Sequence, residues 1–340
     1  MNLRRLLAEA MVGVGVHRLA RRGVSGAILM LHRVRQESDR RWLADPGLWV
    51  TDRHLATLIR ALKRQGYAIV PLDQALDRLA QPDGRPFVCL TFDDGYGDFH
   101  DIALPVLAAE QVPAALYVTS GFVDRAAPLW EVGLEALVAR GGALVADWGE
   151  GERRLDLTTD DGKRAAYGLL CRALRALPPA HRATVLQDLS ERTGLDFIAE
   201  TDRAVITWTR LEALAGSPWV TIGGHTRSHP ALSLLPEAAV AEEMISDRSR
   251  LEQRLGLAVR HFAYPYGDRQ AVAAQTIATA ARQGFASATL AYGGPLRTGD
   301  GAFALPRIGI GGNDSVAAIL LRMAGIGRAA QPTHRAALAL

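Results

Sequence analysis

The segment Phe87–Gly95 reads F-V-C-L-T-F-D-D-G and places two adjacent aspartates directly after an apolar run. A short, continuous apolar run is typical of a strand buried on both faces, as in a parallel sheet. Asp93 and Asp94 then follow the carboxyl end of that strand, where α/β folds gather functional residues. A turn with two solvated aspartates is the structural alternative. The functional interpretation assigns one carboxylate to a metal and the other to general base catalysis.

Apolar segments elsewhere in the chain alternate with helical patterns. We expect further strands near 27–31, 67–70, 114–119, 219–222, 261–263, 285–288 and 303–310. Strands that alternate with helices predict an α/β fold with a parallel sheet, either open or closed into a barrel. The first of these strands ends at His32, so we expect this histidine at the same edge of the sheet as Asp93 and Asp94.

The alternation stops between about residues 125 and 205, where the pattern is mostly helical. We interpret this part as a helical insertion or cap within one domain that spans residues 26–325. Residues 1–25 are predicted to form an N-terminal helix, and residues 326–340 a tail. Trp130 and Trp148 lie in the insertion. We favour core anchors over sugar-stacking platforms for both.

The composition excludes few functions but indicates in which compartment the protein is expected. The chain has 340 residues and a formal net charge of +3, too weak and too scattered an excess to favour nucleic-acid binding. Cys89 and Cys171 give no disulfide framework, which fits a reducing compartment. No stretch approaches the roughly 18 apolar residues of a membrane span, and the N-terminus shows no clean export signal. We therefore expect a cytoplasmic protein.

The N-terminal segment has an amphipathic pattern. Leu3, Leu6, Leu7, Ala10, Met11 and Val14 share one helical face, and arginines lie elsewhere. A helix docked on the domain is the favoured interpretation. The alternative is a basic amphipathic helix that rests on a membrane surface, which would make the protein peripheral at the inner membrane face.

A second motif follows the expected strand 219–222. Gly223–Pro230 reads G-G-H-T-R-S-H-P, with His225 and His229 four residues apart. One helical turn or a compact loop brings both imidazoles to the same side, and this is metal-ligand spacing. Two histidines and one carboxylate form a three-ligand site with open positions, which favours zinc or a similar divalent ion. Such an ion polarises a carbonyl and lowers the pKa of water toward ~7.

The two motifs, in this order, resemble those of the polysaccharide deacetylases, also known as carbohydrate esterase family 4 or NodB-homology proteins. T-F-D-D-G at Thr91–Gly95 is similar to the family's first motif, and H-T-x-x-H at 225–229 to its second. F-A-Y-P-Y-G at Phe262–Gly267 resembles the third motif as found in one branch of the family. The resemblance covers roughly residues 27–310, apart from the insertion. It implies a distorted (β/α)7-type barrel with a groove at the carboxyl ends of its strands.

The resemblance also implies roles for single residues. Asp93 would be the catalytic base, and Asp94, His225 and His229 would hold the metal, expected to be zinc. The backbone N–H of Tyr266 would help to stabilise the tetrahedral oxyanion, a task for a fixed donor. The implied enzyme is a hydrolase of carbon–nitrogen bonds that removes N-acetyl groups from an amino-sugar polysaccharide or oligosaccharide.

The chain departs from the family pattern in two places that matter for catalysis. The third motif usually has an arginine two residues before its proline, where this chain has Ala263. The last motif usually supplies a histidine as general acid, but here L-P-R-I-G-I at Leu305–Ile310 is followed by none. We hypothesise that Arg307 supplies the guanidinium to Asp93 from a neighbouring strand, with a surface arginine as the alternative. We further hypothesise that His32 acts as the acid or binds substrate, with a purely structural histidine as the alternative.

These departures leave two other functions open. A glycan-binding protein with a degenerate site would explain the missing motif residues, although pure binding has no need for Asp93. A metal-dependent amidase or deformylase on a non-polysaccharide substrate would use the same scaffold, because a fold does not determine its substrate. Acetate release from an N-acetylated oligosaccharide separates the leading function from the first alternative.

Overall fold

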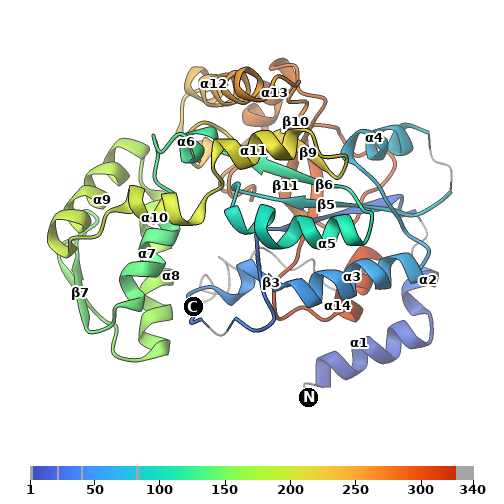
Figure 1. The fold of residues 1–340 in the computed structure, drawn as a ribbon, viewed down its shortest axis with the longest axis horizontal. Helices are drawn as coiled ribbons and strands as arrows, with labels where there is room; N and C mark the ends of the chain where they lie inside the picture. The colour runs from blue at the N-terminus through green and yellow to red at the C-terminus, as the bar shows by residue number, and fades with distance from the viewer. Residues whose placement is uncertain (1–2, 21–22, 40, 82–83, 327–340) are drawn as a thin grey trace.

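The computed structural model describes residues 3–326 except 21–22, 40 and 82–83, so that all but the first residue of the predicted tail lies outside it. Seven parallel strands close into a barrel at the centre of the fold (Figure 1). Their order around the barrel is β1 (Gly26–Leu31), β12 (Leu305–Gly309), β11 (Ser287–Gly293), β10 (His261–Ala263), β9 (Val220–Gly224), β6 (Ala114–Val118) and β5 (Phe87–Phe92). The expected (β/α)7-type barrel is confirmed.

The barrel closes between its first and last strands. β1 pairs with β5 along its whole length, from Gly26 opposite Phe87 onward, and with β12 through Leu29 opposite Ile308. A short further strand, β4 (Ala68–Ile69), pairs with the beginning of β5 outside the ring. β2 (Arg33–Arg35) and β3 (Trp49–Thr51) form a separate parallel pair beyond the end of β1.

Strand alternation decides which side chains face the interior of the barrel. Along β5, Val88 and Leu90 belong to the core between strands and helices, whereas Cys89 joins Ile28 and Tyr117 in a second cluster inside the ring. Side chains two residues apart point to the same side of a strand. Thr91 and Asp93 therefore follow Cys89 on the inner face, toward the carboxyl-end mouth of the barrel.

Helices cover the outside of the barrel (Figure 1). They are α3 (Asp52–Arg64), α4 (Leu72–Ala80), α5 (Leu104–Ala109), α11 (Trp208–Ala215), α12 (Glu237–Leu255), α13 (Ala274–Arg282) and α14 (Val316–Met323). α3 shows why such segments become helical: the hydroxyl of Thr51 caps its start by accepting from the His54 N–H at 3.1 Å. Leu55, Leu58 and Leu62 then bury one face of α3 against the strands.

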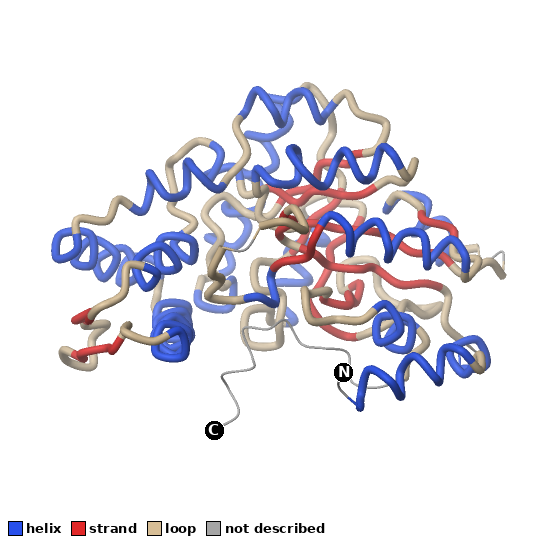
Figure 2. The backbone as a smooth tube through the Cα atoms, turned by 60° about the horizontal axis from the view of Figure 1, so that its bottom comes forward, coloured by secondary structure: helices blue, strands red, loops and turns tan. Residues whose placement is uncertain are grey.

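An insertion lobe, residues 125–205, lies beside the barrel between β6 and β9 (Figure 2). It contains α7 (Trp130–Ala139), α8 (Asp160–Ala176), α9 (Pro179–Thr193) and α10 (Phe197–Ala204). It also contains an antiparallel hairpin that the helical prediction missed, β7 (Ala143–Ala146) with β8 (Arg153–Asp156). Trp130 and Trp148 are buried in a core of the lobe's own, so both act as anchors.

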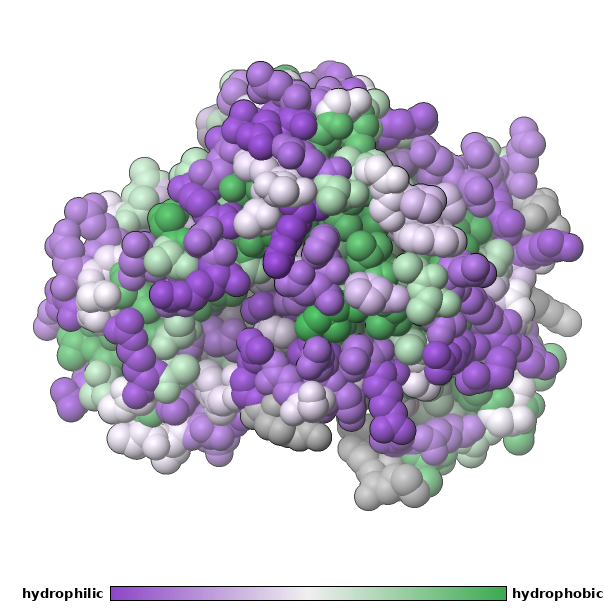
Figure 3. Space-filling model, viewed as in Figure 1, coloured by the Kyte–Doolittle hydropathy of each residue, from purple (hydrophilic) through white to green (hydrophobic). Residues whose placement is uncertain are grey.

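Two helices precede the barrel, α1 (Leu3–Gly13) and α2 (Val16–Ala20). α1 docks on α14, where Ala8 packs against Ala317 and Leu321. Polar side chains cover much of the molecular face in Figure 3, with apolar patches between them, and no described helix is both long and apolar enough to cross a membrane. Leu7 of α1, Leu19 of α2 and Val14 in the turn between them nevertheless remain exposed. Membrane contact stays a prediction, which a liposome-binding assay would test.

Candidate metal and catalytic site

The two aspartates of the first motif reach the same opening because the chain turns sharply between them. The Asp93 N–H continues the ladder beyond β5 by donating to the Leu31 carbonyl at 3.1 Å. In an extended strand the next side chain would point to the opposite side. Asp94 instead has φ 71°, a left-handed conformation that is costly for a non-glycine residue, and it precedes a turn at Gly95. Both carboxylates therefore line one cavity.

The histidines of the second motif lie on a compact loop after β9 rather than on a helical turn. Gly223 lets the strand approach β6, since a Cβ there would lie 2.5 Å from the Tyr117 ring. Thr226 and His229 adopt left-handed φ values of 70° and 56°, and the His229 N–H donates to the Thr226 hydroxyl at 3.0 Å. These turns fold the loop back so that His225 and His229 face Asp94.

Three ligand atoms converge at one buried point. The Nε2 atoms of His225 and His229 each lie 3.3 Å from Oδ1 of Asp94, and the three atoms lie within 4.8 Å of one another. Tetrahedral bonds of roughly 2.0–2.1 Å put neighbouring ligand atoms about 3.3–3.4 Å apart. The donor set and its spacing therefore fit a small divalent cation with a preference for nitrogen and oxygen.

Neighbouring groups prepare these ligands. The Nδ1 of His225 lies 2.7 Å from the Ala263 carbonyl and donates its proton there, which directs Nε2 toward Asp94. Burial lowers the pKa of His229 to about 4, which leaves that imidazole neutral near pH 7. Burial opposes ionisation of Asp94, but hydrogen bonds from both histidines hold its pKa well below the usual value. Burial opposes protonation of His225, but the hydrogen bond to Asp94 and the charges of Asp93 and Asp94 raise its pKa, so a cation bound here would replace a proton on this imidazole.

Arg307 lies beside Asp93 inside the barrel. Its Nη1 and Nη2 each donate to one Asp93 oxygen at 2.7 Å, and its Nε donates to the Leu290 carbonyl at 2.8 Å. Arg307 is fully buried, which is contrary to the surface alternative. Burial favours the protonated form of Asp93, yet the Arg307 charge outweighs it and lowers the pKa of this carboxyl below its ordinary value. Asp93 is therefore an ionised carboxylate with a fixed orientation.

His32 and Tyr266 complete the rim of this cavity, and Glu131 joins them from the lobe. Tyr266 has φ 59°, its ring lies 4.7 Å from that of His229, and its hydroxyl donates to Oε1 of Glu131 at 3.1 Å. His32 follows β1 directly and is half-buried. All seven residues singled out from the sequence thus surround one site, or, for Arg307, support it from inside the barrel.

Glu131 was not identified from the sequence. It stands in the first turn of α7 and is only 7% exposed. Burial raises the pKa of Glu131 to about 7, and the nearby charge of Asp94 acts in the same direction. A signal was present: Leu134 and Val138, three and seven residues further, are buried apolar residues of the same helix. That spacing placed a carboxyl group on the buried face.

Two cavities meet at Glu131. The smaller, about 40 Å³, is lined by Asp93, Asp94 and both ligand histidines. The larger, about 720 Å³, is a groove between the barrel loops and the lobe, with arginines of α8 on one side. The residues that line both are Glu131 and Tyr266. A ligand that occupies both cavities must pass these two side chains.

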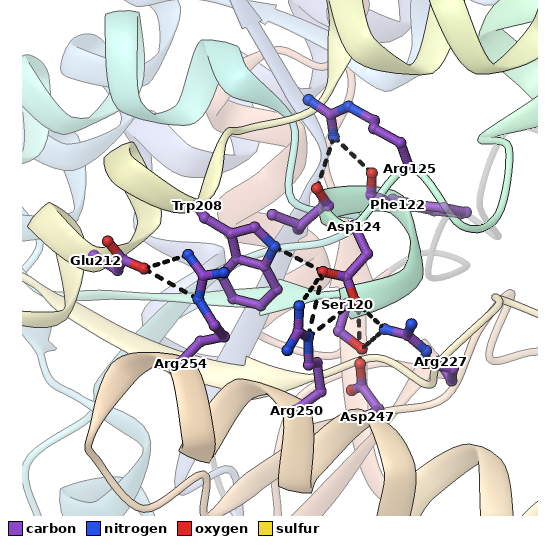
Figure 4. A network of polar contacts seen from close by, with 11 residues as sticks. Ser120, Phe122, Asp124, Arg125, Trp208, Glu212, Arg227, Asp247, Arg250 and Arg254 are labelled. Carbon is purple, nitrogen blue, oxygen red and sulfur yellow. Dashed lines mark hydrogen bonds and ion pairs between the residues drawn. The ribbon is translucent and has the colours of Figure 1, made fainter.

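A polar network holds the histidine loop from the other side (Figure 4). Arg227, between the two ligand histidines, donates to Ser120 Oγ at 3.1 Å and to Asp124 Oδ2 at 2.7 Å. Asp124 also accepts from Arg250 and from the Trp208 indole. Burial opposes ionisation of Asp124, but hydrogen bonds from Arg250, Arg227 and Trp208 together lower its pKa to about 2. The network fixes the loop where the lobe leaves and rejoins the barrel.

Comparisons with known proteins agree with the fold and with the family resemblance of the sequence. A model of the polysaccharide deacetylase family matches residues 80–146 and 149–286, more than half of the chain. The structure is similar to that of the deacetylase PplD of Streptococcus pyogenes in complex with acetate (TM-score 0.59, 19% identity, 88% of this chain and 99% of that one). It is also similar to IcaB from Ammonifex degensii (TM-score 0.56, 22% identity, 89% and 97%). A search among curated proteins gave no match.

Proposed function

We propose, from the premise that this chain belongs to the polysaccharide deacetylase family, that it uses a divalent metal ion to remove N-acetyl groups from an amino-sugar glycan. Membership in the family makes it a hydrolase of carbon–nitrogen bonds other than peptide bonds. The observation that carries the proposal is the convergence of Asp94, His225 and His229 beside the Asp93–Arg307 pair. Two imidazoles and one carboxylate favour zinc.

Asp93 is assigned the role of base toward the attacking water. Asp94, His225 and His229 would hold a divalent ion, which would polarise the acetyl carbonyl and promote ionisation of water. Each Asp93 oxygen accepts one hydrogen bond from Arg307 and keeps a further lone pair for a proton. Arg307 keeps the carboxylate ionised and fixes its plane, so that no reorientation is needed when the water loses its proton.

Tyr266 and His32 are assigned roles in contacting the substrate. Negative charge develops on the acetyl oxygen as water adds, and a donor fixed in the backbone stabilises it without reorganisation. The Tyr266 N–H is such a donor, held by the turn at φ 59° beside the cavity. His32 lines the same cavity from the end of β1, and we assign it contact with the bound substrate.

The two cavities match the two parts of an N-acetylated sugar. The small one, about 40 Å³, holds only a few water-sized groups at roughly 10–15 Å³ each and suits an acetyl group. The groove of about 720 Å³ is large enough for sugar rings. The acetyl carbon then lies beside Asp93 and the ligand triad, while the sugar lies between the barrel and the lobe.

Acetate release tests this function directly. The chelator-treated protein, reloaded with zinc or cobalt, is incubated with an oligomer of N-acetylglucosamine, and acetate and free amine are measured. We expect both products in equal amounts, and none without metal. Glycan binding without acetate release would favour the degenerate binding protein instead. Turnover of small N-acyl amides alone would favour the non-polysaccharide amidase.

A further inference from the structure

The proposed reaction needs a proton donor for the departing nitrogen. An amine leaves an amide as a poor leaving group, and a positioned acid makes its departure possible. Resting on the function proposed above, we infer that Glu131 of the insertion lobe is this acid and donates its proton to the nitrogen of the N-acetyl sugar. The lobe then contributes a catalytic residue as well as a wall of the groove.

The position of Glu131 is the first argument. Glu131 and Tyr266 are the residues that line both the small cavity at the ligand triad and the large groove. When the acetyl group occupies the former and the sugar ring the latter, the carbon–nitrogen bond spans their junction. The bond that breaks therefore lies beside the Glu131 carboxyl group.

The free oxygen of Glu131 is the second argument. Oε1 accepts a hydrogen bond from the Tyr266 hydroxyl at 3.1 Å. Oε2 is buried and has no hydrogen-bond partner among the residues that the structure describes. A buried polar atom without a partner destabilises the fold, so such an atom in a pocket indicates a missing partner. The nitrogen of the substrate would supply it.

The surroundings of Glu131 favour its protonated form. Asp94 faces it from the barrel, the Tyr266 hydroxyl bonds to it, Tyr167 and Cys171 face it from α8, and Glu135 follows one turn later on α7. The backbone N–H of Glu131, the charge of Arg182 on α9 and the Tyr266 hydroxyl oppose protonation. Burial outweighs them and raises the pKa of Glu131 to about 7. A large fraction of the carboxyl group therefore carries a proton near neutral pH.

The protons balance over one turnover. The water oxygen forms a bond to the acetyl carbon while Asp93 takes one water proton. The carbon–nitrogen bond breaks, its electron pair stays on nitrogen, and Glu131 Oε2 gives nitrogen its proton. The products are acetic acid and the free amine of the sugar. The proton on Asp93 returns to Glu131 through solvent, so no further reactant is required.

A pair of substrates separates this role from a structural one. An aryl acetate such as 4-nitrophenyl acetate releases a phenolate that needs no proton, whereas an N-acetylglucosamine oligomer releases an amine. For Glu131→Gln and Glu131→Ala we expect kcat on the oligomer to fall roughly 10²–10⁴-fold. We expect kcat on the aryl ester to change by less than about threefold. The alkaline limb of the kcat/KM profile on the oligomer should also disappear.

Three variants complete the experiment. Glu135→Gln, whose carboxyl group is raised in pKa mainly by burial and accepts from the Ala44 N–H at 2.8 Å, should match the wild type on both substrates. Equal loss on both substrates in the Glu131 variants, or no loss on the oligomer, would overturn the inference. So would a loss confined to the oligomer in His32→Ala instead. If the wild type cleaves the aryl ester but Asp94→Ala does not, and no N-acetyl sugar is cleaved, the proposed function itself is wrong.

Discussion

The barrel and the insertion lobe contribute to the site in different ways. The barrel delivers Asp93 and Asp94 from the end of β5 and His225 from the end of β9, two strands that both pair with β6, so its contribution follows from strand order and register. The lobe has a separate core and reaches the site through Glu131 and the arginines of α8. Functional side chains at strand ends are positioned by a general rule of α/β folds, whereas those of a packed lobe are positioned by contacts particular to this chain. We therefore expect barrel variants to affect the chemical step and groove variants other than those of Glu131 to affect substrate binding.

Removal of a proposed metal ligand should have the largest effect on activity. It sets the scale against which the other barrel and lobe variants are compared. Asp94→Ala leaves two histidines without the oxygen ligand that both approach at 3.3 Å. We expect loss of stable zinc binding, measured as metal content after dialysis, and a fall of kcat by a factor on the order of 10³ or more. Full zinc content in this variant would show that the ligand set is wrong.

Arg307→Ala should have the next largest effect. Asp93 would remain buried without its partner, which costs about 3–5 kcal/mol of stability, measured by urea unfolding at pH 7. We also expect kcat to fall roughly a hundredfold, since the base loses its orientation. Wild-type activity in this variant would contradict the role of Arg307.

The pH dependence of the same variant has a definite sign. With Arg307 present, the folded-state pKa of Asp93 is below its ordinary value of 3.8, despite the opposing effect of burial. The ion pair therefore stabilises the fold above about pH 4 and loses this effect as the pH falls through the folded-state pKa. The difference in unfolding free energy between wild type and Arg307→Ala should shrink as the pH is lowered below 4. A difference in unfolding free energy that grows as the pH is lowered would contradict the stabilising role of this ion pair.

Arg227→Ala tests the junction of the two regions. The network in Figure 4 links the histidine loop to Asp124, at the start of the lobe, and to Trp208 just after it. Groups that orient metal ligands contribute roughly 10–100-fold to metal affinity. We expect a loss of this size in competition with a zinc chelator. Arg254→Ala, which removes the outer pair with Glu212, is the matched control and should retain wild-type affinity.

Arg172→Ala should have the smallest effect and tests the lobe half of the comparison. Arg172 lines the groove, and its Nη1 is buried without a hydrogen-bond partner among the described residues. Loss of a hydrogen bond from a charged donor costs about 1.5–3 kcal/mol at most, so KM for a glycan should rise several-fold to a hundredfold with kcat unchanged. Arg192→Ala, which removes an exposed pair with Glu152, is the control. A fall in kcat at constant KM in Arg172→Ala would contradict the expectation that this part of the lobe affects substrate binding and not the chemical step.

The sequence pattern predicted the parallel strands and the ligand cluster because both follow general rules, whereas closure into a barrel was implied only by the family resemblance. The period of apolar residues set the strands, and the spacing of His225 and His229 set a shared side for two imidazoles. Arg307 was hypothesised to reach Asp93 from a neighbouring strand, but β1 separates β12 from β5, and the contact is made inside the barrel. What it does there stays a proposal for experiment.

Other features could not be predicted because they depend on tertiary contacts. Left-handed φ values at Asp94, Thr226, His229 and Tyr266 are local costs that only the surrounding packing sustains. The position of Glu131 depends on how α7 docks beside Tyr266, which no local pattern encodes. The hairpin β7–β8 lies in charged, glycine-rich sequence with little strand signal, and pairing of its own two strands decides its structure.

The closure of the barrel has a consequence for how the enzyme comes into being. Asp93 and Arg307 are 214 residues apart in the chain, and β1 receives one of its two neighbours only from β12. Synthesis proceeds from the N-terminus, so all three metal ligands leave the ribosome well before Arg307 does. Until then the ring is open and Asp93 has no counter-charge. The last strand is therefore required for a complete site: a chain that stops short of it carries Asp94, His225 and His229 but not Arg307, the partner of Asp93.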